Sequence, residues 1–215
     1  MVKVLELFSG TGSVGKVCKE LGYSVVSLDL KNADININVL DWNYKDYPKF
    51  FFDIIWASPP CQTFSNCRNS WIGRKNSIFG DKIITKELLT KDMIERGVPI
   101  VLKTLEIIEY FEPKVYFIEN PASGRMKEFV NLPFYNVTYC KYSDWGYRKA
   151  TTIWTNKKNF TPKYCRNDCE NMLDKKKHIK TMNGCGKGRS ISGDYYLNLR
   201  YRIPPLLIKE LLTNN

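Results

Sequence analysis

Short apolar runs alternate with segments of helical spacing along the chain, and this alternation limits the fold more than any other feature. Residues 2–8, 23–30 and 115–118 are runs of the kind that form buried strands, while residues 98–111 carry apolar side chains at helical spacing. Strands that alternate with helices predict an α/β domain with a mostly parallel sheet and right-handed crossovers. The pattern continues with strands at 35–40, 52–57, 135–142 and 151–155 and a terminal helix at 203–212.

A cysteine follows two prolines directly after the apolar run 52–57. The segment is Ser58-Pro59-Pro60-Cys61-Gln62-Thr63-Phe64-Ser65. Ligands of doubly wound sheets bind beyond the carboxyl ends of the strands, and each proline restricts its own φ and the residue before it. We therefore predict a thiol held in few conformations at the ligand crevice. The alternative is a buried, unreactive cysteine in a turn.

Positive charge dominates the composition. Lys and Arg total 33 against 22 Asp and Glu, which gives a net charge of +11, as expected of a protein that binds a nucleic-acid backbone. No apolar window approaches the roughly 18 residues of a membrane span, so we expect an intracellular protein, cytoplasmic or nuclear, without a membrane partner. The seven cysteines are irregularly spaced and odd in number, which favours reduced thiols and metal ligation over a disulfide framework.

A glycine-rich turn follows the first strand. Residues 10–15 have the form G-x-G-x-x-G, and Asp29 lies at the end of the next strand. This layout serves dinucleotides, whose pyrophosphate binds at a helix N-terminus, and also S-adenosylmethionine, whose ribose needs an acceptor carboxylate. The turn therefore predicts a nucleoside cofactor without deciding between these two.

Three segments occur in an order and approximate separation that are typical of one enzyme family. They are Phe8-Ser9-Gly10-Thr11-Gly12, the 58–65 segment and Phe117-Ile118-Glu119-Asn120. In these segments the chain resembles the DNA cytosine 5-methyltransferases, in their compact viral or phage form. The resemblance covers residues 2–156, with a weaker echo at 202–205. It implies a Rossmann-like class I S-adenosylmethionine-dependent methyltransferase fold with a mostly parallel seven-stranded sheet, formed by residues 1–156 and completed by 200–215.

The resemblance also implies a cofactor site. S-adenosylmethionine would be bound, with Asp29 accepting hydrogen bonds from the ribose and Asp41 approaching the adenine amino group. The alternative for Asp41 is a cap of the turn before Trp42. The other residues expected to line the cofactor are Phe8, Ser9, Gly10, Thr11, Gly12, Leu30 and Pro59.

The chemistry follows from the same resemblance. Carbon 5 of cytosine does not attack a sulfonium methyl group unaided, so the Cys61 thiolate is expected to add to carbon 6 while Glu119 holds ring nitrogen 3. A free thiol has a pKa near 8.5, so the site must lower that pKa or couple the attack to protonation elsewhere. A cytosine in duplex DNA must also be flipped out of the stack before it can react.

Cations are expected beside this site. Arg148 resembles one arginine of the family's Gln-x-Arg-x-Arg motif, but Gly146 and Ala150 occupy the other two positions, so either Arg148 or Lys149 would carry the charge. The alternative for Arg148 is a surface or phosphate-binding cation. A second group on the loop after Cys61 is expected either to close over the flipped base or to be merely solvated. Its members are Arg68, Trp71, Arg74 and Lys75.

Residues 157–199 are rich in Lys, Asn, Gly and Cys and have little apolar periodicity. They include Cys165, Cys169, His178 and Cys185, a complete tetrahedral set for structural Zn²⁺. The alternative is a Lys-rich segment that merely contains cysteines. We predict a small Cys/His-rich insertion that contacts DNA and reads a very short sequence, because the family usually has a much larger recognition domain here.

Other functions remain consistent with parts of the sequence. The same chemistry on RNA would use the same residues. A catalytically inactive DNA-binding homologue would explain the reduced arginine motif. An NAD-dependent dehydrogenase would share the glycine-rich turn, but it offers no role for Pro60-Cys61-Gln62 or Glu119-Asn120.

Overall fold

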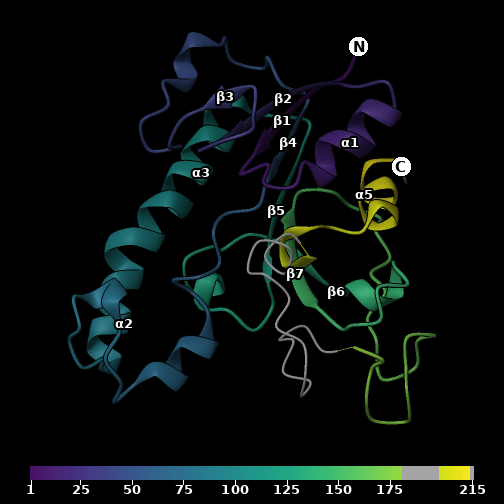
Figure 1. Cartoon of the computed structure of the whole chain (residues 1–215). Coiled ribbons are helices and arrows are strands. Elements are labelled where there is room, and N and C mark those ends of the chain that lie inside the picture. The colour runs from purple at the N-terminus through teal and green to yellow at the C-terminus, as the bar shows by residue number, and fades with distance from the viewer. Residues whose placement is uncertain (181–198, 214–215) are drawn as a thin grey trace.

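The structure, a computed structural model, describes residues 1–180 and 199–213. Its strands are β1 Lys3–Leu7, β2 Ser24–Asp29, β3 Ile35–Asn36, β4 Ile54–Ala57, β5 Val115–Pro121, β6 Phe134–Thr138 and β7 Ala150–Thr155. They form one seven-stranded sheet in the order β3-β2-β1-β4-β5-β7-β6 (Figure 1). The first five strands are parallel, and β7 pairs antiparallel with both β5 and β6. The mostly parallel sheet expected from the sequence is confirmed.

Helices cover both faces of the sheet (Figure 1). Helix α3, Val98–Phe111, lies on one face, and helices α1, Ser13–Glu20, and α5, Pro205–Thr213, lie on the other. Successive strand residues point to opposite faces, so Leu5 packs in the cluster of Val101, while Val4 packs in the cluster of Val17 and Leu207. None of the helices in the described part of the chain is long and apolar enough to cross a membrane.

The loop after β4 is supported by a continuous helical layer. Helix α2, Lys86–Asp92, passes through a π-helical turn, Met93–Gly97, into α3. A Cβ on Gly97 would lie 2.2 Å from Thr63 Oγ1 and 2.9 Å from Phe64 Cζ. The missing side chain therefore lets the residues after Cys61 pack directly against the π-helical turn, a feature that is common near functional sites.

Strand β6 is shorter than the sequence predicts. It ends at Thr138, and residues Tyr139–Lys141 form a 3₁₀ turn instead of continuing the strand to residue 142. Tyr139, Cys140 and Tyr142 are all buried, which an alternating strand with one covered face cannot provide. The 3₁₀ turn places residues three apart on one side, and Tyr139 and Tyr142 accordingly pack in the same cluster.

Candidate active site

Cys61 lies beyond the carboxyl end of β4, as the sequence predicts for that residue. In the sheet, Ala57 of β4 pairs with Leu7 of β1 and with Ile118 of β5, so the loop that follows starts between the glycine-rich turn and Glu119. The buried Asn120 side chain donates from Nδ2 to the Pro59 carbonyl over 2.8 Å. The loop is therefore fastened to the end of β5 directly before Cys61.

Arg68 belongs to the support of this loop. Its guanidinium is buried and forms an ion pair with buried Asp92 at 2.7 Å, and it also donates to the Thr63 carbonyl over 3.3 Å. Both expectations for Arg68, closing over a flipped base and being merely solvated, are wrong, because a buried and paired cation is withdrawn from the surface. Arg74 and Lys75 remain exposed on the same loop.

Glu119 is a buried carboxylate with two polar partners. Tyr139 donates its hydroxyl hydrogen to Glu119 Oε1 over 2.8 Å, and Lys149 Nζ lies 3.5 Å from the same oxygen. Both partners are themselves buried, and Lys149 also sits 4.7 Å from the centre of the Tyr139 ring. Burial, reinforced by the charge of Glu119, raises the pKa of Tyr139 well above its ordinary value, so this hydroxyl stays a donor. Both contacts use Oε1 of the carboxylate.

The Cys61 thiol is partly buried, and the charges of Glu119 and Lys149 influence its pKa. Burial raises its pKa, the negative charge of Glu119 raises it further, and the positive charges of Lys149 and Arg200 act in the opposite direction. The thiol is therefore mostly protonated at neutral pH in the free protein. A reaction of this thiol as a nucleophile would therefore need a base or a change in the charges around it.

The structure places Lys149, and not Arg148, beside Glu119. Arg148 is exposed, donates to the Tyr164 hydroxyl over 3.1 Å and lies 5.3 Å from the centre of that ring. Neighbouring residues of an extended segment point to opposite sides, so only one of the two cations can face the carboxylate. The sequence leaves open whether Arg148 or Lys149 supplies the positive charge in the site. Lys149 is the one whose ammonium group lies near the Glu119 carboxylate.

Residues 199–203, which lie far along the chain from Cys61, form hydrogen bonds with Lys149 and Gln62. Lys149 Nζ donates to the Arg200 carbonyl over 3.0 Å, and Gln62 donates from Nε2 to the Tyr201 hydroxyl over 3.0 Å. Tyr139 and Tyr201 are therefore parts of the site that sequence reasoning missed. No spacing in the sequence marks Tyr139, whereas Tyr201 directly precedes the weak echo of the family's last motif at 202–205.

The predicted cofactor residues Phe8 to Gly12 form the turn after β1, and Asp29 contacts this turn. Phe8, Gly10 and Gly12 have left-handed φ values of 60°, 50° and 66°, a conformation that glycine adopts without strain. Asp29 accepts from Gly10 N over 2.8 Å through Oδ2 and from Leu30 N over 2.6 Å through Oδ1. Each carboxylate oxygen keeps a second lone pair for a ribose hydroxyl, so this turn suits a nucleoside ligand.

Leu30 follows Asp29 and is 67% exposed, which leaves an apolar surface where an adenine ring could pack. Asp41 is also exposed, and its backbone N donates to the Asn38 carbonyl in the turn before Trp42. Both alternatives given for Asp41 from the sequence, an adenine contact and a cap of that turn, stay open.

A buried carboxyl group lies under the glycine-rich turn. Glu6 is 3% exposed and accepts from Gly15 N over 3.0 Å through Oε2. A Cβ on Gly15 would lie 2.6 Å from that oxygen, so glycine is required for this close approach. Burial raises the pKa of Glu6 to about 7, although the backbone N–H groups of Gly15 and Val14 oppose the rise.

Glu6 gives a testable pH dependence of stability. Its folded pKa exceeds the ordinary value of 4.5, so folding takes up a proton, and stability falls as the pH rises from about 4.5 to about 7. Glu6→Gln keeps an acceptor for Gly15 N but does not titrate, so between pH 4 and pH 8 it should gain about 3 kcal/mol relative to the unmodified protein. Urea unfolding across this range measures the difference. Glu112→Gln, at an exposed carboxylate, is the control, and parallel profiles for all three proteins would contradict the assignment.

The predicted metal residues lie in the described part of the insertion, with one exception. Cys165, Cys169 and His178 are brought together, whereas Cys185 falls outside the described residues. Cys140, from the turn after β6, joins the cluster. Sequence reasoning missed Cys140 because it lies outside the insertion.

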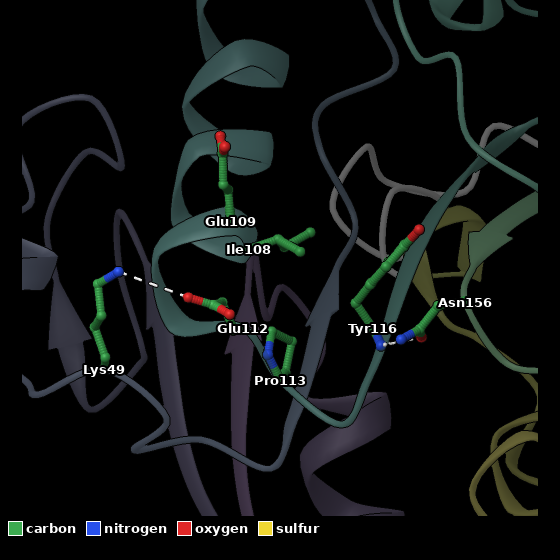
Figure 2. A pocket seen from close by; sticks show the side chains of 7 residues that line it. All are labelled: Lys49, Ile108, Glu109, Glu112, Pro113, Tyr116 and Asn156. Carbon is green, nitrogen blue, oxygen red and sulfur yellow. Dashed lines mark hydrogen bonds and ion pairs between the residues drawn. The ribbon is translucent and has the colours of Figure 1, made fainter.

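A surface hollow lies away from both the candidate active-site residues and the predicted metal residues (Figure 2). It is lined by Lys49, Ile108, Glu109, Glu112, Pro113, Tyr116 and Asn156. It lies near the amino end of β5, opposite to the end that carries Glu119. Its charged groups include the exposed pair of Lys49 and Glu112, 3.6 Å apart. We assign it no role in the chemistry.

Comparison with known proteins first gives the class. The solved structure of the Entamoeba histolytica methyltransferase EhMeth matches 90% of this chain with a TM-score of 0.51 at 15% identity, and this chain spans 64% of that structure's length. This likeness shows the methyltransferase fold. No family model matches the chain.

A sequence relative then gives the family. The probable DNA (cytosine-5)-methyltransferase of Frog virus 3 (isolate Goorha) is 42% identical over 221 residues, which cover 98% of this chain and 99% of that protein. The chain belongs to the DNA (cytosine-5)-methyltransferase family. The resemblance seen in the three sequence segments is confirmed.

Proposed function

We propose that the protein transfers the methyl group of S-adenosylmethionine to carbon 5 of cytosine in DNA through a transient bond between Cys61 and carbon 6. The observation that carries this proposal is that buried Glu119, with Tyr139 and Lys149 as partners, lies close enough to Cys61 for its charge to raise the pKa of that thiol. The 42% identity to a probable DNA (cytosine-5)-methyltransferase supports it.

The residues of the glycine-rich turn would hold the cofactor. The left-handed backbone at Gly10 and Gly12, the Asp29 carboxylate and the exposed Leu30 side chain suit the methionine, ribose and adenine parts of S-adenosylmethionine. When bound, this molecule supplies an electrophilic methyl group. The protein's own task is to make carbon 5 of the base nucleophilic.

Cys61 and Glu119 divide that task. The Cys61 thiol gives up its proton to solvent, its sulfur forms a bond to carbon 6, and the electron pair of the ring's 5,6 double bond becomes available at carbon 5. Glu119, after taking up a proton, donates that proton to ring nitrogen 3, so the negative charge of the adduct is stabilised. Tyr139 holds the carboxylate through Oε1, and Lys149 balances its charge. After methylation the proton of carbon 5 leaves to solvent, and the carbon–sulfur bond breaks to restore the double bond. Ring nitrogen 3 returns its proton to Glu119, and the released thiolate takes up a proton from solvent.

A nucleic-acid backbone is the partner that the charge distribution favours, and the printed name of the Frog virus 3 relative points to DNA. The described part of the insertion exposes Lys163, Arg166, Lys175, Lys176, Lys177 and Lys180. This segment meets the loop that carries Lys149, because Lys180 N donates to the Gly146 carbonyl over 2.7 Å. We propose that residues 157–199 bind phosphates and position the target cytosine, which must be flipped from the stack.

Methyl transfer to defined substrates tests this function. The purified protein should transfer label from methyl-labelled S-adenosylmethionine to duplex DNA, and bisulfite sequencing should place the product at cytosines within a short sequence. DNA in which 5-methylcytosine replaces cytosine should accept no label. Label on tRNA but not on DNA would replace this proposal by the RNA reaction. Binding to DNA without label on either substrate would indicate an inactive homologue.

A further inference from the structure

We propose that Cys140, Cys165, Cys169 and His178 bind one structural Zn²⁺ that fastens the basic insertion to the active site. One ligand atom from each residue can be chosen so that all four lie within 4.8 Å of one another. His178 Nε2 lies 3.6 Å from Cys165 Sγ and 3.3 Å from Cys169 Sγ. The four side chains come from two segments that are separated in the sequence and converge on one point.

These distances match the edges of a tetrahedral zinc site. Zinc–sulfur bonds of about 2.3 Å and zinc–nitrogen bonds of about 2.0 Å give sulfur-to-nitrogen edges of about 3.6 Å and sulfur-to-sulfur edges of about 3.8 Å. The two observed sulfur-to-nitrogen distances are close to that edge. Since every pair of donors lies within 4.8 Å, none needs to approach another by more than about 1 Å to reach zinc geometry.

The donor set favours zinc over other occupants. Three thiolates and an imidazole in tetrahedral arrangement are typical of Zn²⁺. All four positions are filled by protein, which is typical of structural sites, because catalytic sites keep one position for water or substrate. A disulfide between two of the cysteines would not explain why a ring nitrogen and a third sulfur point at the same place, and the three cysteines are free thiols.

Hydrogen bonds hold the two ligand-bearing segments together. Cys165 N donates to Thr138 Oγ1 over 2.7 Å at the end of β6. The buried Asn171 side chain donates from Nδ2 to the Cys140 carbonyl over 2.9 Å, and its Oδ1 accepts from Gly146 N over 2.9 Å. Met172 and His178 form an isolated antiparallel bridge, which returns the ring towards the cysteines. The scaffold thus brings the four ligands together through contacts of its own.

The described part of the insertion needs such a support because, beyond Phe160, it has almost no core. Within residues 163–180, Cys165 and Asn171 are the buried residues, and the lysines and most other side chains are exposed. A segment of this kind gains little from apolar burial, and metal binding can supply folding free energy directly.

One ligand of the proposed zinc site is the sequence neighbour of a residue that contacts Glu119. Cys140 directly follows Tyr139, whose hydroxyl holds Glu119. The metal would therefore fix the turn that orients the Glu119 carboxylate and, at the same time, the exposed lysines proposed to bind DNA. This second role depends on the proposed function, whereas metal binding itself does not.

Metal analysis with two matched cysteine variants tests the site. The purified full chain should contain about one zinc per molecule by mass spectrometry of the metal, and Co²⁺ in its place should give thiolate-to-cobalt charge-transfer bands of a tetrahedral site. Cys140→Ser should lose most of the metal and the bands. Cys67→Ser, at an exposed thiol outside the cluster, should keep both.

Cys185→Ser tests whether Cys140, as in the structure, or Cys185, as expected from the sequence, is the fourth metal ligand. It should keep the metal if Cys140 is the fourth ligand. Metal lost in Cys185→Ser but kept in Cys140→Ser would overturn the proposal. Should Cys140→Ser fail to fold, the unmodified protein still decides, because a chain purified with zinc in the medium that holds no metal and gives no cobalt bands would overturn it. These readouts do not use methyl transfer, so they stand apart from a failure of the proposed function.

Discussion

Replacing Cys61 by alanine is expected to abolish the covalent complex that the protein forms with duplex DNA containing 5-fluorocytosine. In the proposed reaction the Cys61 sulfur bonds to carbon 6, and its release requires loss of the substituent at carbon 5. Hydrogen leaves as a proton, but fluorine cannot leave as a cation, so the complex persists. The unmodified protein should give a DNA-linked band in a denaturing gel when S-adenosylmethionine is present, and Cys61→Ala should give none.

Cys67→Ala is the matched control for this experiment. Cys67 is an exposed free thiol six positions further along the same loop, so its loss should leave the band unchanged. A band that survives in Cys61→Ala but disappears in Cys67→Ala would show that the other thiol attacks the base. A folded, cofactor-binding protein that forms no band at all would favour the inactive homologue.

The trapping rate should also depend on pH. Burial and the charge of Glu119 raise the pKa of Cys61, so the thiolate fraction of the free protein is small at neutral pH and grows as the pH rises. We expect alkylation of Cys61 in the free protein to become faster with rising pH. Trapping should show a weaker rise, since a bound base that hydrogen-bonds to Glu119 would remove part of the repulsion.

The sheet and the position of Cys61 could be predicted because each depends on local pattern. Apolar runs such as 52–57 mark buried strands, and the parallel order puts the residues that follow β1, β4 and β5 at one edge of the sheet. The length of β6 could not be predicted in this way. Residues 139–142 are as apolar and aromatic as a strand, and only the packing of Tyr139 and Tyr142 on one side turns them into a 3₁₀ helix.

The partners of the site residues could not be predicted because they depend on tertiary register. Whether Arg148 or Lys149 faces Glu119 is set by the pairing of Thr138 with Ala150 in the β6–β7 ladder. Arg68 resembles a loop cation in the sequence, and its burial follows from a partner, Asp92, on a different helix.

Cys140 was missed for a related reason. It lies 25 residues before Cys165, outside the insertion that the composition marks. Its place in the cluster depends on the hydrogen bond between Cys165 N and Thr138 Oγ1. Spacing rules for metal ligands apply to short local motifs, so they identified Cys165, Cys169 and His178 and could not reach a ligand on the neighbouring strand end.

Replacing Glu119 by glutamine is expected to slow methyl transfer by roughly 10²–10⁴-fold, the usual contribution of a positioned acid or base. Glutamine keeps the size of the side chain and an oxygen that can accept from Tyr139, but it cannot carry a proton to ring nitrogen 3. Cofactor affinity should stay unchanged, because Asp29 and the Gly10 turn belong to another part of the site. Single-turnover kinetics measure the rate, and calorimetric titration with S-adenosylmethionine measures the affinity.

Lys149 makes a second variant necessary. Glu119→Gln leaves this buried ammonium group without its counter-charge, and an unpaired buried charge is destabilising by itself. The double variant Glu119→Gln with Lys149→Met removes that cost, so it should fold more stably than Glu119→Gln yet remain as slow. Glu128→Gln, at an exposed carboxylate paired with Arg125, should keep the full rate. Recovery of the rate in the double variant would show that Glu119 only balances the charge of Lys149 and takes no part in the chemistry.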